Sequence, residues 1–93
     1  MTEAIVKTEF GALYLKKLCR HFARKVPTTM SESQARIEFP FGPNRISVDD
    51  EQMHLQIEVD DSAEIDSAEQ VVAEHLIRMA HKESLTVQWK RHS

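Results

Sequence analysis

The chain has 93 residues, of which 41% are hydrophobic and 29% charged, and this composition fits one globular domain over residues 1–93. A formal net charge of −3 argues against a nucleic-acid-binding protein that relies on bulk positive charge, and a single Cys excludes an internal disulfide framework. No apolar run approaches the ~20 residues of a membrane span, and the N-terminus lacks a signal-peptide pattern, so we expect a cytoplasmic protein that does not engage a membrane.

The N-terminal third is predicted to form a strand and then a helix. Residues 2–8 alternate in the two-residue period of a strand. Residues 10–25 have the helical period, and a step of 100° per residue places six apolar side chains on one face: Ala12, Leu15, Leu18, Cys19, Phe22 and Val26. Pro27 disfavours the helical conformation at Val26, so we expect the helix to end there.

The middle of the chain is predicted to form strands with one apolar face each. Residues 27–31 are short and extended, and the alternation then recurs over residues 34–41, 45–48 and 53–59. The strongest turn signal in the chain is Gly42-Pro43-Asn44. Successive one-sided strands indicate an antiparallel meander with its other face in water.

The C-terminal third is predicted to form a second helix and a last strand. Ser67 and Gln70 have the spacing of a capping box, and the helix is expected to end near Glu83. Its apolar stripe contains Ala68, Val71, Val72, His75, Leu76 and Met79. Residues 85–89 alternate again as a strand.

The expected order is therefore β-α-β-β-β-β-α-β. Because both helices are amphipathic and the strands are one-sided, we predict an α+β two-layer sandwich. Both helices should cover one face of a mostly antiparallel sheet.

Charge is distributed unevenly along the chain. Residues 1–45 hold eight basic and four acidic side chains, whereas residues 46–93 hold four basic and eleven acidic ones. One interpretation is that these are two solvated faces with no further role. The other is a dipolar molecule, whose basic first helix attracts an anion and whose acidic surface pairs with a basic partner or with a second copy.

The first helix contains the best candidate for a binding site. Lys17, His21, Arg24 and Lys25 lie within about 100° of arc at the helical step, and no acidic residue lies between them. Tyr14 adds an aromatic edge. We expect the four basic side chains to be solvent-accessible and to bind a small anion, and the alternative is an ordinary solvated helix face.

Four other residues are predicted to be buried and structural. They are Cys19, Phe22, His75 and Trp89. Cys19 and His21 are two residues apart on a helix and point in different directions, so they cannot bind one ion together. The alternative for His75 is a functional buried acid or base. We expect no metal site and no other cofactor, because the sequence contains no P-loop, dinucleotide-binding fingerprint, nucleophile elbow or Cys-x-x-Cys motif.

Several segments resemble a small bacterial family known as domain of unknown function 2218. They are residues 14–27 with the core Leu18-Cys19-Arg20-His21-Phe22, then Phe39-Pro40-Phe41-Gly42, Val72 with His75-Leu76, and Leu85-Thr86-Val87 with Trp89. One departure is Asn44, near where many relatives carry a small residue or Cys.

The resemblance implies stand-alone domains or parts of iron-uptake clusters, beside siderophore-interacting proteins and iron–siderophore transporters. Some relatives carry the label of a dihydroxyheptenedioate aldolase. The residues argue against that activity, because such an enzyme needs a metal triad on a barrel of ~200 residues or a Schiff-base Lys in a deep pocket. Neither feature occurs in this sequence.

We therefore expect a non-enzymatic binding or accessory domain, linked to siderophore or iron handling. Its partner would be a small anionic ligand or an iron-uptake protein, and not a nucleic acid. One alternative is a small enzyme with His21 or His75 as acid or base. Another is a homo-oligomeric assembly module, of which a homo-dimer is the simplest form.

Overall fold

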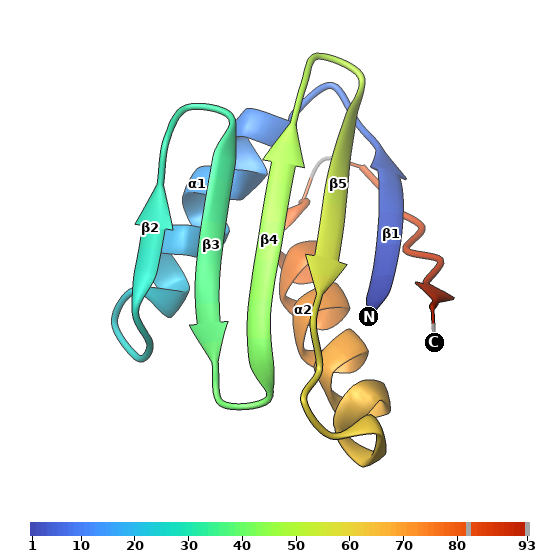
Figure 1. The fold of residues 1–93 in the computed structure, drawn as a ribbon. Coiled ribbons are helices and arrows are strands. Elements are labelled where there is room, and N and C mark those ends of the chain that lie inside the picture. Colours follow the sequence, from blue (N-terminus) through green and yellow to red (C-terminus); the bar gives the residue numbers. More distant parts are fainter. Residues whose placement is uncertain (82, 93) are drawn as a thin grey trace.

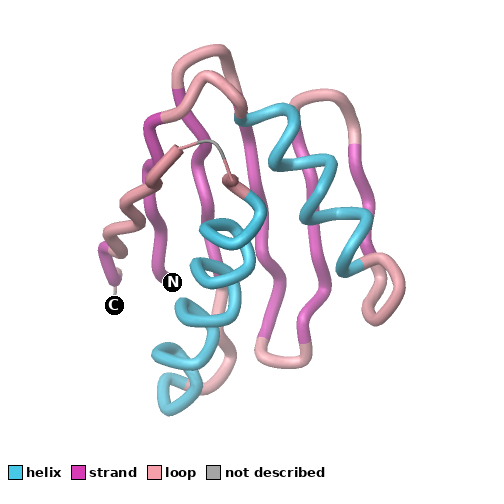
Figure 2. Tube along the Cα trace, turned by 180° about the vertical axis from the view of Figure 1, so that it is seen from behind, coloured by secondary structure: helices cyan, strands magenta, loops and turns pink. Residues whose placement is uncertain are grey.

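The computed structural model describes residues 1–81 and 83–92. Its elements are β1 (Thr2–Lys7), α1 (Gly11–Phe22), β2 (Thr28–Met30), β3 (Gln34–Phe39), β4 (Gly42–Val48), β5 (Gln52–Ile57), the 3₁₀ turn η1 (Ser62–Glu64), α2 (Ile65–Met79) and β6 (Lys90–Arg91). The strands form one antiparallel sheet in the order β2-β3-β4-β5-β1-β6, with α1 and α2 on the same face (Figures 1 and 2). The predicted order and the α+β sandwich are confirmed. No described helix is long and apolar enough to cross a membrane.

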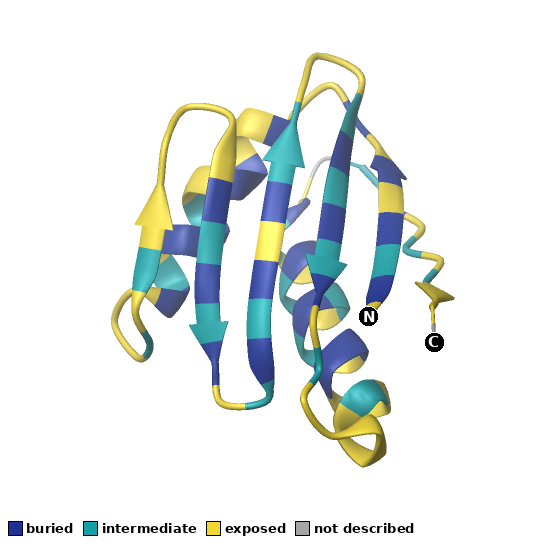
Figure 3. Ribbon diagram, viewed as in Figure 1, coloured by how far each residue is buried: buried dark blue, intermediate teal, exposed yellow. Residues whose placement is uncertain are grey.

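The sheet forms because alternate side chains of each strand share one apolar face. Leu55 in β5 lies opposite Ala4 in β1 and Ile46 in β4, and all three are buried against the helices. The intervening residues face the open side of the sheet and are half-buried or exposed. Along β1, β3, β4 and β5 they therefore alternate with the buried residues that face the helices (Figure 3). The register thus places most of the apolar side chains of the strands on the helix side, and Ile5 of β1 is an exception that faces the open side.

The core lies between this sheet face and the two helices. Seven residues from the apolar faces that the sequence predicts are buried in it: Leu15, Phe22, Ile37, Phe39, Ile57, Val72 and Leu76. Phe22 packs edge-on against Phe39, with 4.8 Å between ring centroids. Trp89 and His75, predicted to be buried, are half-buried and contact the core from its margin.

The first helix ends three residues earlier than predicted. The backbone N–H of Ala23 still donates to Cys19, but Lys25 and Val26 both donate to the carbonyl of Phe22. The chain therefore leaves the helix in a tight turn before Pro27, which brings β2 to the edge of the sheet. The restriction that proline imposes thus acts over the whole last turn.

The second helix has different ends from those predicted. It begins at Ile65, so Ser67 lies inside the first turn and does not form the capping box with Gln70. Asp61 acts upstream instead, since its side chain accepts a hydrogen bond from the N–H of Ala63 and caps η1. The helix ends at Met79, not near Glu83.

The hairpin between β3 and β4 also turns earlier than predicted. Phe39 pairs with Gly42, so Pro40 and Phe41 form the two-residue connection. Pro43 and Asn44 are part of β4, where Asn44 is buried and its Nδ2 donates to the Gln56 carbonyl at 2.9 Å. The amide of Asn44 is therefore satisfied inside the sheet.

The predicted strand over residues 85–89 is wrong, although the alternation is present. Leu85 is buried, Val87 is half-buried, and the residues between them are exposed, yet strand pairing occurs only at Lys90–Arg91. The pairing forms where the Arg91 guanidinium reaches Glu69 of α2, which is 9% exposed and also accepts a hydrogen bond from Thr2. The bonds from Arg91 hold the pKa of Glu69 below its usual range.

Cys19 is a buried thiol, and we predict that it is unreactive in the native protein. It is 3% exposed, and burial raises its pKa, so little of the reactive thiolate is present. Cys19→Ala should fold with a modest loss of stability. An absorbance assay with an aromatic disulfide reagent should show slow modification in native buffer and fast modification in denaturant. Fast modification of the native protein would contradict this assignment.

Candidate functional site

The two helices bring together two histidines that are far apart in sequence. α1 and α2 run in opposite directions on the same face of the sheet (Figure 2). His21, near the end of α1, lies beside His75 of α2. Their ring centroids are 5.0 Å apart and the rings are tilted by 44°. This pair sits at the junction of the two helices, at one margin of the core.

Phe22 separates the histidine pair from the core. Its ring lies 4.9 Å from His21 and 4.8 Å from His75. His75 Nδ1 is 2.7 Å from the carbonyl oxygen of Val71, one helical turn earlier. His21 is half-buried, contrary to the prediction of an open side chain, and its Nε2 is buried without a hydrogen-bond partner among the described residues. That nitrogen is a buried polar atom, closed off from solvent, which no described group satisfies.

Cations surround the histidine pair. Burial lowers the pKa of His21 from its usual 6.5, and His75, Lys25, Arg24 and Arg78 lower it further by charge repulsion. We call the group the helix-junction cluster; its members are Lys17, His21, Arg24, Lys25, His75 and Arg78. The structure thus adds His75 and Arg78 of α2 to the four residues predicted on α1.

The cations of this cluster have no carboxylate partner, a feature that they share with Lys7, Lys16, Arg20 and Lys90 among the described residues. Arg36, Arg45 and Arg91 each form an ion pair with a carboxylate. In residues 1–81 and 83–92, no carboxylate lies within ion-pair distance of the four cluster cations. The cluster is therefore an uncompensated positive region in a protein whose net charge is −3.

Tyr14 does not present an aromatic edge to this cluster, so that prediction is wrong. It is 3% exposed, and its hydroxyl donates to Glu83 Oε2 at 2.5 Å. Thr8 donates to the same oxygen at 2.8 Å. Burial, together with the neighbouring Glu83, raises the pKa of Tyr14 to about 12. Tyr14 instead ties the segment after α2 to α1 and β1.

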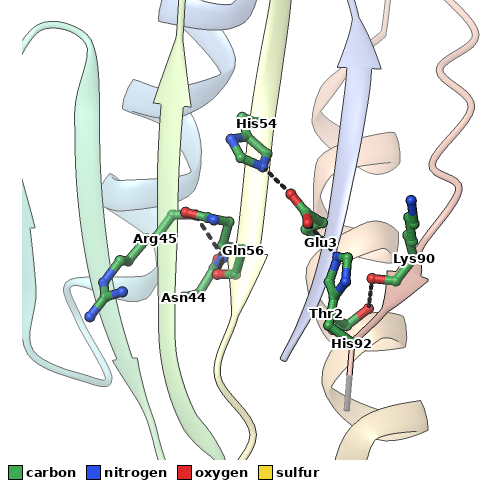
Figure 4. A network of polar contacts seen from close by, with 8 residues as sticks. All are labelled: Thr2, Glu3, Asn44, Arg45, His54, Gln56, Lys90 and His92. Carbon is green, nitrogen blue, oxygen red and sulfur yellow. Dashed lines mark hydrogen bonds and ion pairs between the residues drawn. The ribbon is translucent and has the colours of Figure 1, made fainter.

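A second polar group lies on the open face of the sheet, and sequence reasoning missed it. Glu3 of β1 accepts hydrogen bonds from His54 of β5, at 2.7 Å, and from His92 near the C-terminus (Figure 4). The bond from His54, with that from His92, lowers the pKa of Glu3. The same segment is held by the N–H of His92, which donates to the Met1 carbonyl at 2.7 Å. We interpret this group as a clasp for the C-terminal segment.

Neither polar group has the composition of a metal centre. Among the described residues, no set of three or more His, Cys, Asp or Glu side chains is arranged to hold a metal ion. The helix-junction cluster combines imidazoles with ammonium and guanidinium groups, which attract anions. Its positive charges favour an anion over a metal cation.

Comparison with known proteins identifies the family and supports the fold. The model of a family described as "Uncharacterized protein conserved in bacteria (DUF2218)" matches residues 3–90. The chain is similar to the NMR structure of PA4090 from Pseudomonas aeruginosa, with a TM-score of 0.79 and 27% identity. That similarity covers 96% of this chain and 93% of the other. No curated protein sequence matches the chain significantly.

Proposed function

The chain belongs to the uncharacterised bacterial family DUF2218, and we propose that it is a binding domain whose ligand is a small anion held at the helix-junction cluster. The observation that carries this proposal is the pair of imidazoles of His21 and His75, 5.0 Å apart, on which the charges of Arg24, Lys25 and Arg78 act. None of the three has a carboxylate within ion-pair distance in the described part of the chain, although three other arginines do.

An anion would relieve the repulsion within this cluster. Cations that converge on a partly buried imidazole raise the free energy of the folded state, and a bound negative charge lowers it again. The attraction between the cluster and an anion is therefore electrostatic, and the buried Nε2 of His21 takes no direct part in it.

Binding is better supported than acid–base catalysis at these histidines. A catalytic imidazole is commonly oriented by a carboxylate on its second nitrogen. Among the described residues, His75 contacts a backbone carbonyl and His21 Nε2 has no partner, so no carboxylate orients either ring. The cluster therefore has the positive charges that would hold an anion, and it lacks the orienting carboxylate that is common beside a catalytic imidazole.

The class of anion follows from the family resemblance and from charge. A ferric siderophore that retains carboxylate or catecholate charges carries several negative oxygens, and so does citrate. Both match a site with several cations spread over two helices. The link to iron handling thus supplies specific probes, and sulfate serves as a simple reference anion.

We predict that anion binding is lost when the cluster cations are neutralised. Isothermal titration with sulfate, citrate and a ferric catecholate siderophore should be carried out on two triple variants and the unmodified protein. The cluster variant is Arg24→Gln, Lys25→Gln and Arg78→Gln. The control variant, with the same change of net charge elsewhere, is Lys7→Gln, Lys16→Gln and Lys90→Gln.

The cluster variant should bind about tenfold more weakly, since each exposed charge contributes about 0.5 kcal/mol, whereas the control should be unchanged. Binding to the unmodified protein should weaken as salt rises from about 0.05 to about 0.5 M, because the ligand charges are screened. Equal affinities in the two variants would contradict the proposal.

A further inference from the structure

A groove opens on the helix side of the sheet, beside the first turns of α1 and away from the histidine pair near its end. It lies between the exposed side of α1, the end of β2 with its following loop, and the turn between β4 and β5. Its volume is about 840 Å³, which lies in the range of ligand-binding clefts. α1 crosses this side of the sheet obliquely and contacts β2, β3 and β4, and the groove lies beside its first turns (Figure 2).

The floor of the groove is apolar and exposed. Leu13 is 48% exposed and Met30 is 49% exposed, and Leu15 and Val48 lie between them. Ala12, predicted to face the core, faces this groove instead and is exposed. Large apolar side chains that are about half exposed on neighbouring elements indicate a surface that contacts another molecule.

The rim of the groove is negative. It carries four carboxylates and one cation: Glu9, Glu32, Asp49, Asp50 and Lys16. In the described part of the chain no ion pair neutralises any of them. An occupant that carries positive charge beside an apolar group therefore complements both the rim and the floor.

The adjacent strand β2 has a free main-chain edge. Ser31 donates to the Gln34 carbonyl, and Glu38 donates to the carbonyl of Pro27. In an antiparallel pair this alternation turns the N–H and C=O groups of Thr28 and Met30 away from β3. Met30 pairs with buried Ala35, so its side chain lies on the groove side of the sheet. A strand added here would point alternate side chains towards the groove.

We propose that this groove and the edge of β2 together bind an extended, basic segment of a partner protein. The segment pairs its main chain with Thr28 and Met30. One of its apolar side chains contacts Leu13 and Met30, and its Lys or Arg side chains meet the acidic rim. The free main-chain edge favours a polypeptide over a small organic cation, which would use only the charge and the apolar floor.

The test uses fluorescence anisotropy with a labelled peptide in which Lys and Val alternate, and with a matched peptide of alternating Glu and Val. The rim variant is Glu32→Gln with Asp50→Asn. Its control is Glu64→Gln with Asp60→Asn, which changes the net charge equally outside the groove. A second pair is Met30→Pro, which removes the outward N–H without touching the β3 ladder, and Met30→Leu, which keeps that N–H.

We expect the basic peptide to bind and the acidic one not to bind. The rim variant and Met30→Pro should each weaken binding about tenfold, and both controls should retain it. The proposal would be overturned if the basic peptide bound the rim variant and its control with equal affinity, or bound Met30→Pro and Met30→Leu with equal affinity. It would also be overturned if butylammonium displaced the peptide at the same concentration as the peptide. Sedimentation that shows this face occupied by a second copy of the chain would overturn it as well.

Discussion

Replacement of Phe22 by Ala is expected to lower the free energy of unfolding by about 3–5 kcal/mol. The ring of Phe22 is 6% exposed and packs against Phe39 at 4.8 Å and against both His21 and His75. Truncation removes these contacts and leaves a cavity where the helices meet the sheet. A loss of this size is a large share of the stability of an ordinary small domain.

Phe10→Ala is the matched control, because Phe10 loses the same atoms but is 44% exposed. Its effect should be about 1 kcal/mol or less. Urea unfolding followed by circular dichroism measures both variants against the unmodified protein. If Phe22→Ala were no more destabilising than Phe10→Ala, Phe22 would not be a central core residue.

Gly42→Ala is expected to destabilise the protein by at least about 3 kcal/mol, from backbone strain and a steric clash together. Gly42 has φ of +138°, a conformation that residues with a Cβ rarely adopt. An added Cβ would lie 1.7 Å from the carbonyl oxygen of Glu58. The chain after β5 would have to move away from β4, which breaks the hydrogen bond from Glu58 N–H to Pro43.

Gly11→Ala provides the contrast, since Gly11 starts α1 with an ordinary backbone conformation. Its Cβ would lie 3.1 Å from Val48 Cβ and 3.2 Å from Met53 Cγ, so each neighbour must give way by a few tenths of an ångström, Met53 by its side chain and Val48 with its backbone. Ala also favours the helix by about 0.5–1 kcal/mol, so the net change should stay within about 1 kcal/mol. Thermal unfolding of the two variants would contradict this account if Gly11→Ala were the more harmful.

The order of elements could be predicted because it depends on local periodicity. The alternation through Ile37 and Phe39, and the helical stripe through Leu15 and Phe22, are properties of neighbouring residues. The element ends could not be predicted in the same way. They depend on contacts made far along the chain, such as the bond from Arg91 to Glu69 that sets where the last strand forms.

The sequence predicted only the part of the candidate site that lies on α1. The helical step identifies Lys17, His21 and Lys25 as neighbours on one face, and this geometry needs only α1. His75 and Arg78 belong to α2, and no sequence pattern indicates which face of one helix meets the other. Tyr14 was misplaced for the same reason, because its partner Glu83 follows the second helix.

The most direct test of anion binding at the helix-junction cluster is the pKa of His21, measured by NMR of its imidazole. Titrations should be run in sulfate and in chloride at equal ionic strength. The pKa of His21 lies below 6.5 in the free protein, and a bound anion stabilises the protonated ring. Binding should therefore strengthen as the pH falls below about 6.5. We predict a higher pKa for His21 in sulfate than in chloride. An identical pKa for His21 in both salts would contradict the proposed site.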